Sequence, residues 1–308
     1  MKFWKFNHIN QCGLQINQVS CKSIFTNLKH MATLSILNHD RNIFNKKYIY
    51  PVVSRRAGGL SLGINLNTNN ACNWQCIYCE IPNLTRGKPE PIDTELLEKE
   101  LRFWLDEIIK NKFLEKHTPP KTLFKDIAFS GNGEPTASRE FSDAIKIVIN
   151  VVNEFKLNNL ITIRLITNGS YISDQPVQKA WGLIKEVKKE VWFKIDSIIE
   201  EDIKIINQIN PSINTTTKNI EACIAISPTI IQTCLIKING KLPSNKGIDK
   251  YIAFLKAYEN QLKGIHLYSL ARPTEQKNVA SIERLTQNEL GIIADKISKL
   301  NLPVSAYV

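Results

Sequence analysis

The sequence predicts an α/β fold in which six strand–helix units form an open, partial (β/α)6 barrel. Short apolar runs alternate with helical patterns from about residue 60 onward, and this alternation favours a parallel sheet with right-handed crossovers. Several runs are rich in β-branched residues, as in strands covered on both faces. Six units are fewer than the eight of a closed barrel. The candidate strands are residues 60–66, 126–130, 160–167, 190–196, 230–238 and 264–270.

Helical patterns fill the intervals between these runs. The first helix follows a capping residue, Asp93, and carries an apolar stripe that includes Leu97 and Leu101. The last helix begins with a capping box, Thr286 with Glu289 three residues later. The helices between them cover residues 141–152, 173–188, 217–226 and 246–262, and a short segment, 302–307, is expected to add an edge strand.

Composition fits one large domain without a membrane span. The chain has 308 residues, of which 43% are hydrophobic, and it holds no run of 18 apolar residues. Its seven cysteines show no disulfide framework, so a reducing cytoplasm is expected. The net charge of +11 is spread along the chain, which allows a nucleic-acid partner without indicating one.

Residues 1–30 differ from the rest because they contain lysines and no acidic residue. They show neither the apolar core nor the small-residue cleavage site of a targeting peptide. We therefore expect an extension outside the fold, with the true start at Met31 and a single domain over residues 31–308. Cys12 and Cys21 would then take no part in the chemistry.

Three cysteines, Cys72, Cys76 and Cys79, lie in residues 71–80, here called the cysteine loop. Three thiolates on one loop can bind three irons of a [4Fe–4S] cube and leave one iron open, whereas an ordinary electron-transfer cluster takes four cysteines. The alternative is structural zinc, which needs four ligands. The nearest histidines, His39 and His117, are more than 30 residues away and form no motif.

The Cys-x3-Cys-x2-Cys spacing resembles that of the radical S-adenosylmethionine (SAM) superfamily, whose aromatic residue before the last cysteine is matched by Tyr78. The chain is most similar to a poorly characterised bacterial group related to the enzymes of wyosine synthesis, and the segment Ser-Leu-Gly-Ile-Asn-Leu before the cysteine loop is part of that likeness. The resemblance implies the radical SAM type of core, with a [4Fe–4S] cluster and SAM as cofactors, and it places Tyr78 among the SAM contacts.

Residues 130–136, Ser-Gly-Asn-Gly-Glu-Pro-Thr, form the glycine loop after the second predicted strand. Alone, the pattern is typical of an ordinary turn before a helix. Beside the cysteines it resembles the Gly-Gly-Glu-Pro element that holds the amino group of SAM. The resemblance implies SAM contacts at Asn132, Gly133 and Glu134, although Asn132 replaces the usual glycine.

Two further strand ends carry candidate SAM contacts. Asn168 and Ser170 follow the third strand in a Thr-Asn-Gly-Ser turn, and the resemblance implies contacts to the carboxylate or ribose of SAM. Lys194 and Asp196 share one face at the end of the fourth strand. Asp196 is placed among the SAM contacts, and a plain internal ion pair with Lys194 is the alternative.

Other polar residues have weaker signals. Four polar residues lie on or after the last two predicted strands: Gln232, His266, Tyr268 and Arg272. They either line the mouth where substrate binds or serve the fold. Cys234 is expected to be an inert buried thiol.

Two basic pairs flank the cysteine loop in sequence. Arg55 with Arg56 precedes it, and Arg86 with Lys88 follows it. They either meet phosphates or a carboxylate or remain solvated surface charge.

The resemblance implies an enzyme of oxidoreductase or transferase type that reductively cleaves SAM to a 5′-deoxyadenosyl radical. Its substrate is unidentified, with tRNA or another RNA favoured, and its electron donor is a separate protein such as flavodoxin or ferredoxin. The alternatives are a glycyl-radical or peptide-modifying activase and a non-catalytic metal-binding or nucleic-acid-binding module. We expect a cytoplasmic protein without a membrane partner.

Overall fold

A computed structural model describes residues 34–35, 45–210, 212–277 and 280–308 of the chain. Within it, Leu34–Val308 forms one compact unit. The predicted extension, with Cys12, Cys21 and the start at Met31, lies outside the described residues. None of the helices in the described ranges is long and apolar enough to cross a membrane.

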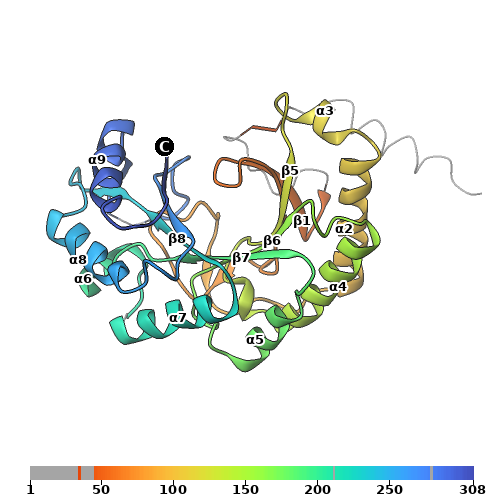
Figure 1. Cartoon of the computed structure of the whole chain (residues 1–308), viewed down its shortest axis with the longest axis horizontal. Coiled ribbons are helices and arrows are strands. Elements are labelled where there is room, and N and C mark those ends of the chain that lie inside the picture. Colours follow the sequence, from red (N-terminus) through yellow and green to blue (C-terminus); the bar gives the residue numbers. More distant parts are fainter. Residues whose placement is uncertain (1–33, 36–44, 211, 278–279) are drawn as a thin grey trace, which may run out of the picture. The chain divides into compact units, whose positions relative to one another are not determined.

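The centre of the fold is an eight-stranded sheet that curls into an open half-barrel (Figure 1). Seven neighbouring strands run parallel from β2 to β12, and β1 pairs antiparallel with β2 at one edge. In sheet order the strands are β1 (Ile49–Ser54), β2 (Gly59–Ile64), β5 (Phe124–Phe129), β6 (Thr162–Thr167), β7 (Lys188–Lys194), β8 (Thr229–Cys234), β10 (Gly264–Tyr268) and β12 (Val304–Tyr307).

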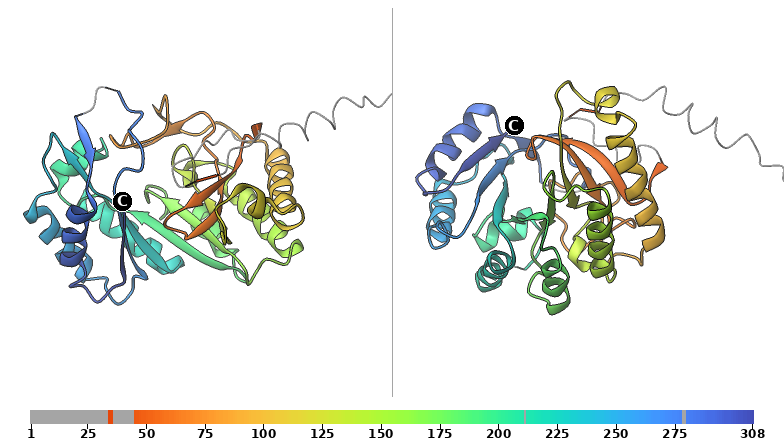
Figure 2. Two further views of the ribbon diagram at one scale, coloured as in Figure 1. Left: turned by 90° about the horizontal axis from the view of Figure 1, so that it is seen from above. Right: turned by 45° about the vertical axis from the view of Figure 1, so that its right-hand side comes forward.

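The helices lie on the outside of the curled sheet (Figure 2). Both predicted caps are present, because Asp93 accepts from the Leu96 amide and Thr286 and Glu289 form a reciprocal capping box. The helices are α2 (Thr94–Ile109), α3 (Phe113–His117), α4 (Phe141–Glu154), α5 (Gln175–Gly182), α6 (Glu200–Ile206), α7 (Ile213–Ile226), α8 (Asn245–Lys256) and α9 (Gln287–Ile297), and a 3₁₀ turn, η2, covers Pro135–Ala137.

The predicted α/β class and the sequential parallel strands are confirmed, with three local corrections. The run 230–238 is two strands, since β8 ends at Cys234 and β9 (Ile236–Ile238) pairs with β11 (Ile282–Arg284) in a separate ribbon. The helix expected over 173–188 ends at Gly182. Strand β1 was not predicted; it contains Pro51, which an edge strand tolerates.

The two faces of the sheet differ in polarity. In β6, Ile163 and Leu165 are buried in the hydrophobic core, while Arg164 and Ile166 point to the opposite face and are partly exposed. Strand alternation therefore places the apolar side chains against the helices and polar ones on the inner face of the half-barrel.

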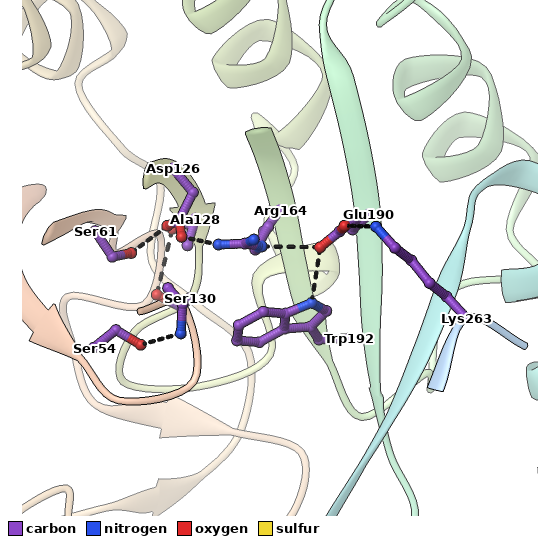
Figure 3. A network of polar contacts seen from close by, with 10 residues as sticks. Ser54, Ser61, Asp126, Ala128, Ser130, Arg164, Glu190, Trp192 and Lys263 are labelled. Atoms are coloured by element: carbon purple, nitrogen blue, oxygen red, sulfur yellow. Dashed lines mark hydrogen bonds and ion pairs between the residues drawn. The ribbon is translucent and has the colours of Figure 1, made fainter. Parts of the chain in front are cut away.

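A chain of charges crosses this inner face (Figure 3). Asp126 accepts from Arg164, whose Nε also donates to Glu190 Oε2 at 3.0 Å. Ser61 donates to Asp126, and Lys263 pairs with Glu190. The Asp126 side chain is 1% exposed and that of Arg164 13%, so the shared guanidinium neutralises two carboxylates that have little access to water.

Replacing Arg164 with methionine should lower the free energy of unfolding by about 3–5 kcal/mol, because it leaves two buried carboxylates without their shared cation. Urea unfolding measures the effect. Arg102→Met is the matched control, since Arg102 also joins two carboxylates, Glu98 and Glu154, but on the surface, where such pairs contribute about 1 kcal/mol or less. Equal losses in the two variants would contradict the role given to burial.

Candidate functional site

The cysteine loop follows β2 at the carboxyl end of the parallel strands, as predicted. Its main chain is held by segments far away in sequence. The Ile77 amide donates to Ile206 O at 2.8 Å, and the Thr274 hydroxyl donates to Ile77 O at 2.7 Å. Gln276 Nε2 donates to Cys79 O at 3.1 Å. An irregular loop needs such partners for its peptide groups.

All three motif cysteines line one cavity of about 180 Å³. The glycine loop and the end of β6 line the same cavity, so the structure brings together most of the predicted site. Among the described residues no group of three or more His, Cys, Asp or Glu side chains is close enough to hold a single metal ion. The predicted SAM contacts on this cavity are Tyr78, Asn132, Gly133, Glu134 and Asn168.

The other two predicted contacts, Ser170 and Asp196, line an adjacent cavity of about 280 Å³. The two cavities share Trp74, Asn168 and Lys194 in their walls. The remaining lining of the adjacent cavity is mostly amide, hydroxyl and apolar side chains from the end of β7 and from α7.

Glu134 is buried, and protein donors reach both of its carboxylate oxygens. Oε1 accepts from Thr167 Oγ1 at 2.7 Å and from Thr136, and Oε2 accepts from the Asn168 amide at 2.7 Å. Burial raises the pKa of the carboxyl, while these donors lower it in part. The carboxylate therefore joins the glycine loop to the turn after β6, and Oε2, which has one protein donor, can accept a second hydrogen bond.

The two glycines of the glycine loop are required by close packing against the start of the cysteine loop. A Cβ on Gly131, whose φ is +143°, would lie 2.4 Å from Asn65 Oδ1. A Cβ on Gly133 would lie 2.2 Å from Ala71 O. Both distances are shorter than any van der Waals contact, so a side chain at either position would push the two loops apart.

Asn132 stands where the Gly-Gly-Glu-Pro pattern has glycine, and it bonds the glycine loop to neighbouring residues. Its amide donates to Asn65 Oδ1 at 3.0 Å, and its Nδ2 donates to Asn70 Oδ1 at 2.6 Å. The substitution thus adds a side-chain bond between the glycine loop and the segment before the cysteines.

Asp196 has four protein partners and a fully buried side chain. It accepts from Tyr78 OH at 2.5 Å, from Asn207 Nδ2 at 2.8 Å and from the Cys234 amide at 2.9 Å. Lys194 Nζ lies 3.6 Å away, so the ion pair left open as an alternative is present. Burial and the charge of Asp196 raise the pKa of Tyr78 well above its usual value.

Asn207 is a site residue that the sequence did not indicate. Its Nδ2 lies 3.3 Å from Cys76 Sγ and is oriented by Asp196. It follows the short helix α6 in a stretch rich in Ile, Lys and Asn, where one more asparagine carries no signal.

Asn168 and Ser170 also contact the cysteine loop. Asn168 Nδ2 donates to Asn73 Oδ1 at 2.9 Å, and Trp74 Nε1 donates to Ser170 Oγ at 3.1 Å.

Burial raises the pKa of the Cys72 thiol to about 12 and that of Cys76 to about 11. Both are therefore thiols at neutral pH until a metal displaces the proton.

Gln232 lies on β8, and His266 and Tyr268 lie on β10. Gln232 and His266 are direct partners in the register of these two strands. Gln232 is fully buried, and its Oε1 accepts from Arg56 Nη1 at 2.9 Å. Tyr268 OH accepts from Lys194 Nζ at 2.5 Å. These side chains continue the polar inner face toward the cysteine cavity, since Lys194 lines that cavity too.

Arg272 and Cys234 have other positions. Arg272 forms an ion pair with Glu80 and so holds the end of the cysteine loop. Cys234 is buried, and burial raises its thiol pKa, as expected for an inert cysteine.

No family model matches the chain. It is 28% identical over 249 residues to a UPF0026 protein in each of two Helicobacter pylori strains, 26695 and J99, a match that covers 78% of this chain and 70% of each relative. The chain is therefore similar to the UPF0026 proteins over most of its described length.

Two further matches are more limited. A protein of Brachyspira hyodysenteriae named GTPase Obg is 31% identical over 169 residues, which make up 55% of this chain but only 22% of that protein. A crystal structure of archaeal TYW1 aligns with a TM-score of 0.44 and 17% identity, covering 78% of this chain and 72% of that one.

His266 should make stability depend on pH. Burial and the charges of Arg56 and Arg164 lower its pKa from 6.5 to about 4. The folded state thus resists protonation between these values, and its stability falls as pH drops from about 6.5 toward about 4. Unfolding of His266→Gln should take up fewer protons over this window, by up to about one. Urea midpoints measured against pH test this, and identical profiles for both proteins would refute it.

Proposed function

We propose that the chain is a radical SAM enzyme in which Cys72, Cys76 and Cys79 hold a [4Fe–4S] cluster. The observation that carries the proposal is the cavity that joins the three thiols to the glycine loop and to Asn168. A cube binds each thiolate at a different iron, so its ligands should surround a space. The described lining of the cavity contains three cysteines and no histidine, which suits a cluster with one open iron.

Cluster and SAM together would supply one-electron cleavage of the SAM sulfonium bond, giving a 5′-deoxyadenosyl radical that takes hydrogen from the substrate. The electron would come from a separate donor such as flavodoxin or ferredoxin, in a reducing cytoplasm. The substrate stays unassigned at this step, with tRNA the first candidate. The six-unit radical SAM core is the architecture that this proposal assigns to the curled sheet.

The residues of this chain would bind and orient SAM along the two cavities. Because Glu134 Oε2 accepts one protein hydrogen bond, we assign the amino group of SAM to this oxygen together with main-chain carbonyls of the glycine loop. Asn168, in the walls of both cavities, would contact the middle of the ligand. Ser170 and the amides and hydroxyls of the adjacent cavity would contact ribose and adenine.

Cys76→Ala should abolish cluster assembly and, with it, 5′-deoxyadenosine formation by the anaerobically reconstituted protein with dithionite and SAM. Iron analysis and chromatography measure both. Cys223→Ala is the matched control, because Cys223 is buried in the hydrophobic core and does not line the cavity. Bound zinc without iron, or an intact cluster in the Cys76 variant, would overturn the assignment.

Glu134→Ala should weaken SAM binding about tenfold or more, equivalent to about 1.4 kcal/mol, while iron content stays unchanged. The reason is that its carboxylate holds the Asn168 amide and the end of β6 in place. Calorimetric titration of the reconstituted protein with SAM gives the affinity. Glu140→Ala, at the N-cap of α4, serves as control, and an unchanged SAM affinity in the Glu134 variant would refute its role.

A further inference from the structure

The carboxyl end of α6 holds the middle of the cysteine loop. Asn207 caps this helix, and its main-chain carbonyl accepts from the Gln75 amide at 3.3 Å. The carbonyl of the preceding residue, Ile206, accepts from the Ile77 amide at 2.8 Å. The peptide of Cys76 therefore lies between two hydrogen bonds to the end of α6, and this arrangement places Cys76 beside the Asn207 side chain.

The side-chain amide of Asn207 has one possible orientation. Its Nδ2 donates to Asp196 Oδ2 at 2.8 Å, and an ionised carboxylate accepts hydrogen bonds without donating any. The NH2 group must therefore face Asp196, and the same nitrogen lies 3.3 Å from Cys76 Sγ. Because an NH2 group has two hydrogens, one can bond to the carboxylate while the other bonds to the sulfur.

Asp196 is itself fixed, so the Asn207 amide is held in this orientation. The Asp196 side chain is fully buried and also accepts from Tyr78 OH and from the Cys234 amide. Asn207 is 1% exposed, and a hydrogen bond in such surroundings is electrostatically stronger than one in water. The donor to the Cys76 sulfur is therefore both oriented and shielded from water.

The donor to Cys76 differs in kind from the donor to Cys72. Cys72 Sγ accepts from the Trp74 amide at 3.4 Å, a main-chain bond that any residue except proline could supply at that position. Cys76 Sγ accepts from a side chain that lies 131 residues later in the chain. The bond to Cys76 therefore depends on the residue at position 207, and a substitution there removes it without changing the sequence of the cysteine loop.

A donor to a cysteine sulfur affects how easily a bound iron–sulfur cluster is reduced. Reduction adds negative charge that the thiolates share, and hydrogen bonds to the sulfurs are among the factors that set the reduction potential. Hydrogen bonds to charged acceptors are stronger than those to neutral ones. A donor at Cys76 should therefore stabilise the reduced state more than the oxidised state.

We propose that Asn207 is a positioning residue that raises the reduction potential of the cluster through its hydrogen bond to the Cys76 thiolate. The inference rests on the proposed function, because it needs a cluster at the three cysteines. Asn207 lines the adjacent cavity, whereas Cys76 lines the cysteine cavity. Asn207 thus acts across the wall between the two cavities, and it determines how much of the cluster an electron donor of given potential reduces.

The test is a spectroscopic redox titration of the anaerobically reconstituted full-length protein without SAM. Asn207→Leu keeps the approximate size of the side chain and removes the donor. It should lower the equilibrium constant for one-electron reduction tenfold or more, which corresponds to a potential lower by about 59 mV, with unchanged iron content. Asn219→Leu is the matched control, since Asn219 is also a buried asparagine that lines the adjacent cavity, and it should keep the wild-type potential.

Asn207→Ala guards against a folding defect of the leucine variant, because the main-chain bond of residue 207 to Gln75 is kept. It should lower the potential as well. An unchanged or raised potential in the Asn207 variants, or an equal decrease in the Asn219 variant, would overturn the proposal.

The titration also separates this inference from the proposed function. A wild-type protein that assembles no iron–sulfur cluster would overturn the proposed function, and the role of Asn207 with it. A fully assembled cluster whose potential is the same with and without the Asn207 amide would contradict the role of Asn207 alone.

Discussion

The rest of this structure depends on the polar inner face of its curled sheet. The outer face is covered by helices, and none of the described helices covers the inner one, so charges on the inner face find partners across neighbouring strands. Register makes this possible. Glu190 lies directly opposite Arg164 on β7, and Asp126 lies on the same face of β5, two residues before Ala128, the β5 partner of Arg164. The same face continues through Lys194 to the cysteine cavity. The charged side chains that stabilise the sheet therefore lie on the same face as the site.

The cysteine loop is formed by local sequence but positioned by distant segments. Its three thiols come from eight consecutive positions, yet its main chain is bonded to residues at the end of α6 and to residues after β10. Arg272 adds an ion pair with Glu80 at the end of the loop. The position of the loop therefore depends on α6 and on the segment after β10, which couples the site to the second half of the fold.

Sequence reasoning found what depends on short patterns. The cysteine spacing, the glycine loop and the capping box each lie within a few residues. The capping box is confirmed, and the cysteines and the glycine loop line one cavity. What it missed depends on register or on long-range contacts. Arg164 lies mid-strand among apolar residues, and only pairing with β5 and β7 shows that it joins two acids. Asn207 can be recognised as a site residue only from its contacts with Asp196 and Cys76, which lie 11 and 131 residues away in sequence.

The two acids expected to touch SAM both accept hydrogen bonds from groups of the protein. Glu134 and Asp196 are both buried and use their oxygens for donors of the protein itself. A buried carboxylate needs such donors, and once it has them it acts by orienting its neighbours: Asn168 in one case, Tyr78 and Asn207 in the other. The lining of the cysteine cavity also includes the three thiols, apolar side chains such as Ile81 and Leu84, and the cation Lys194.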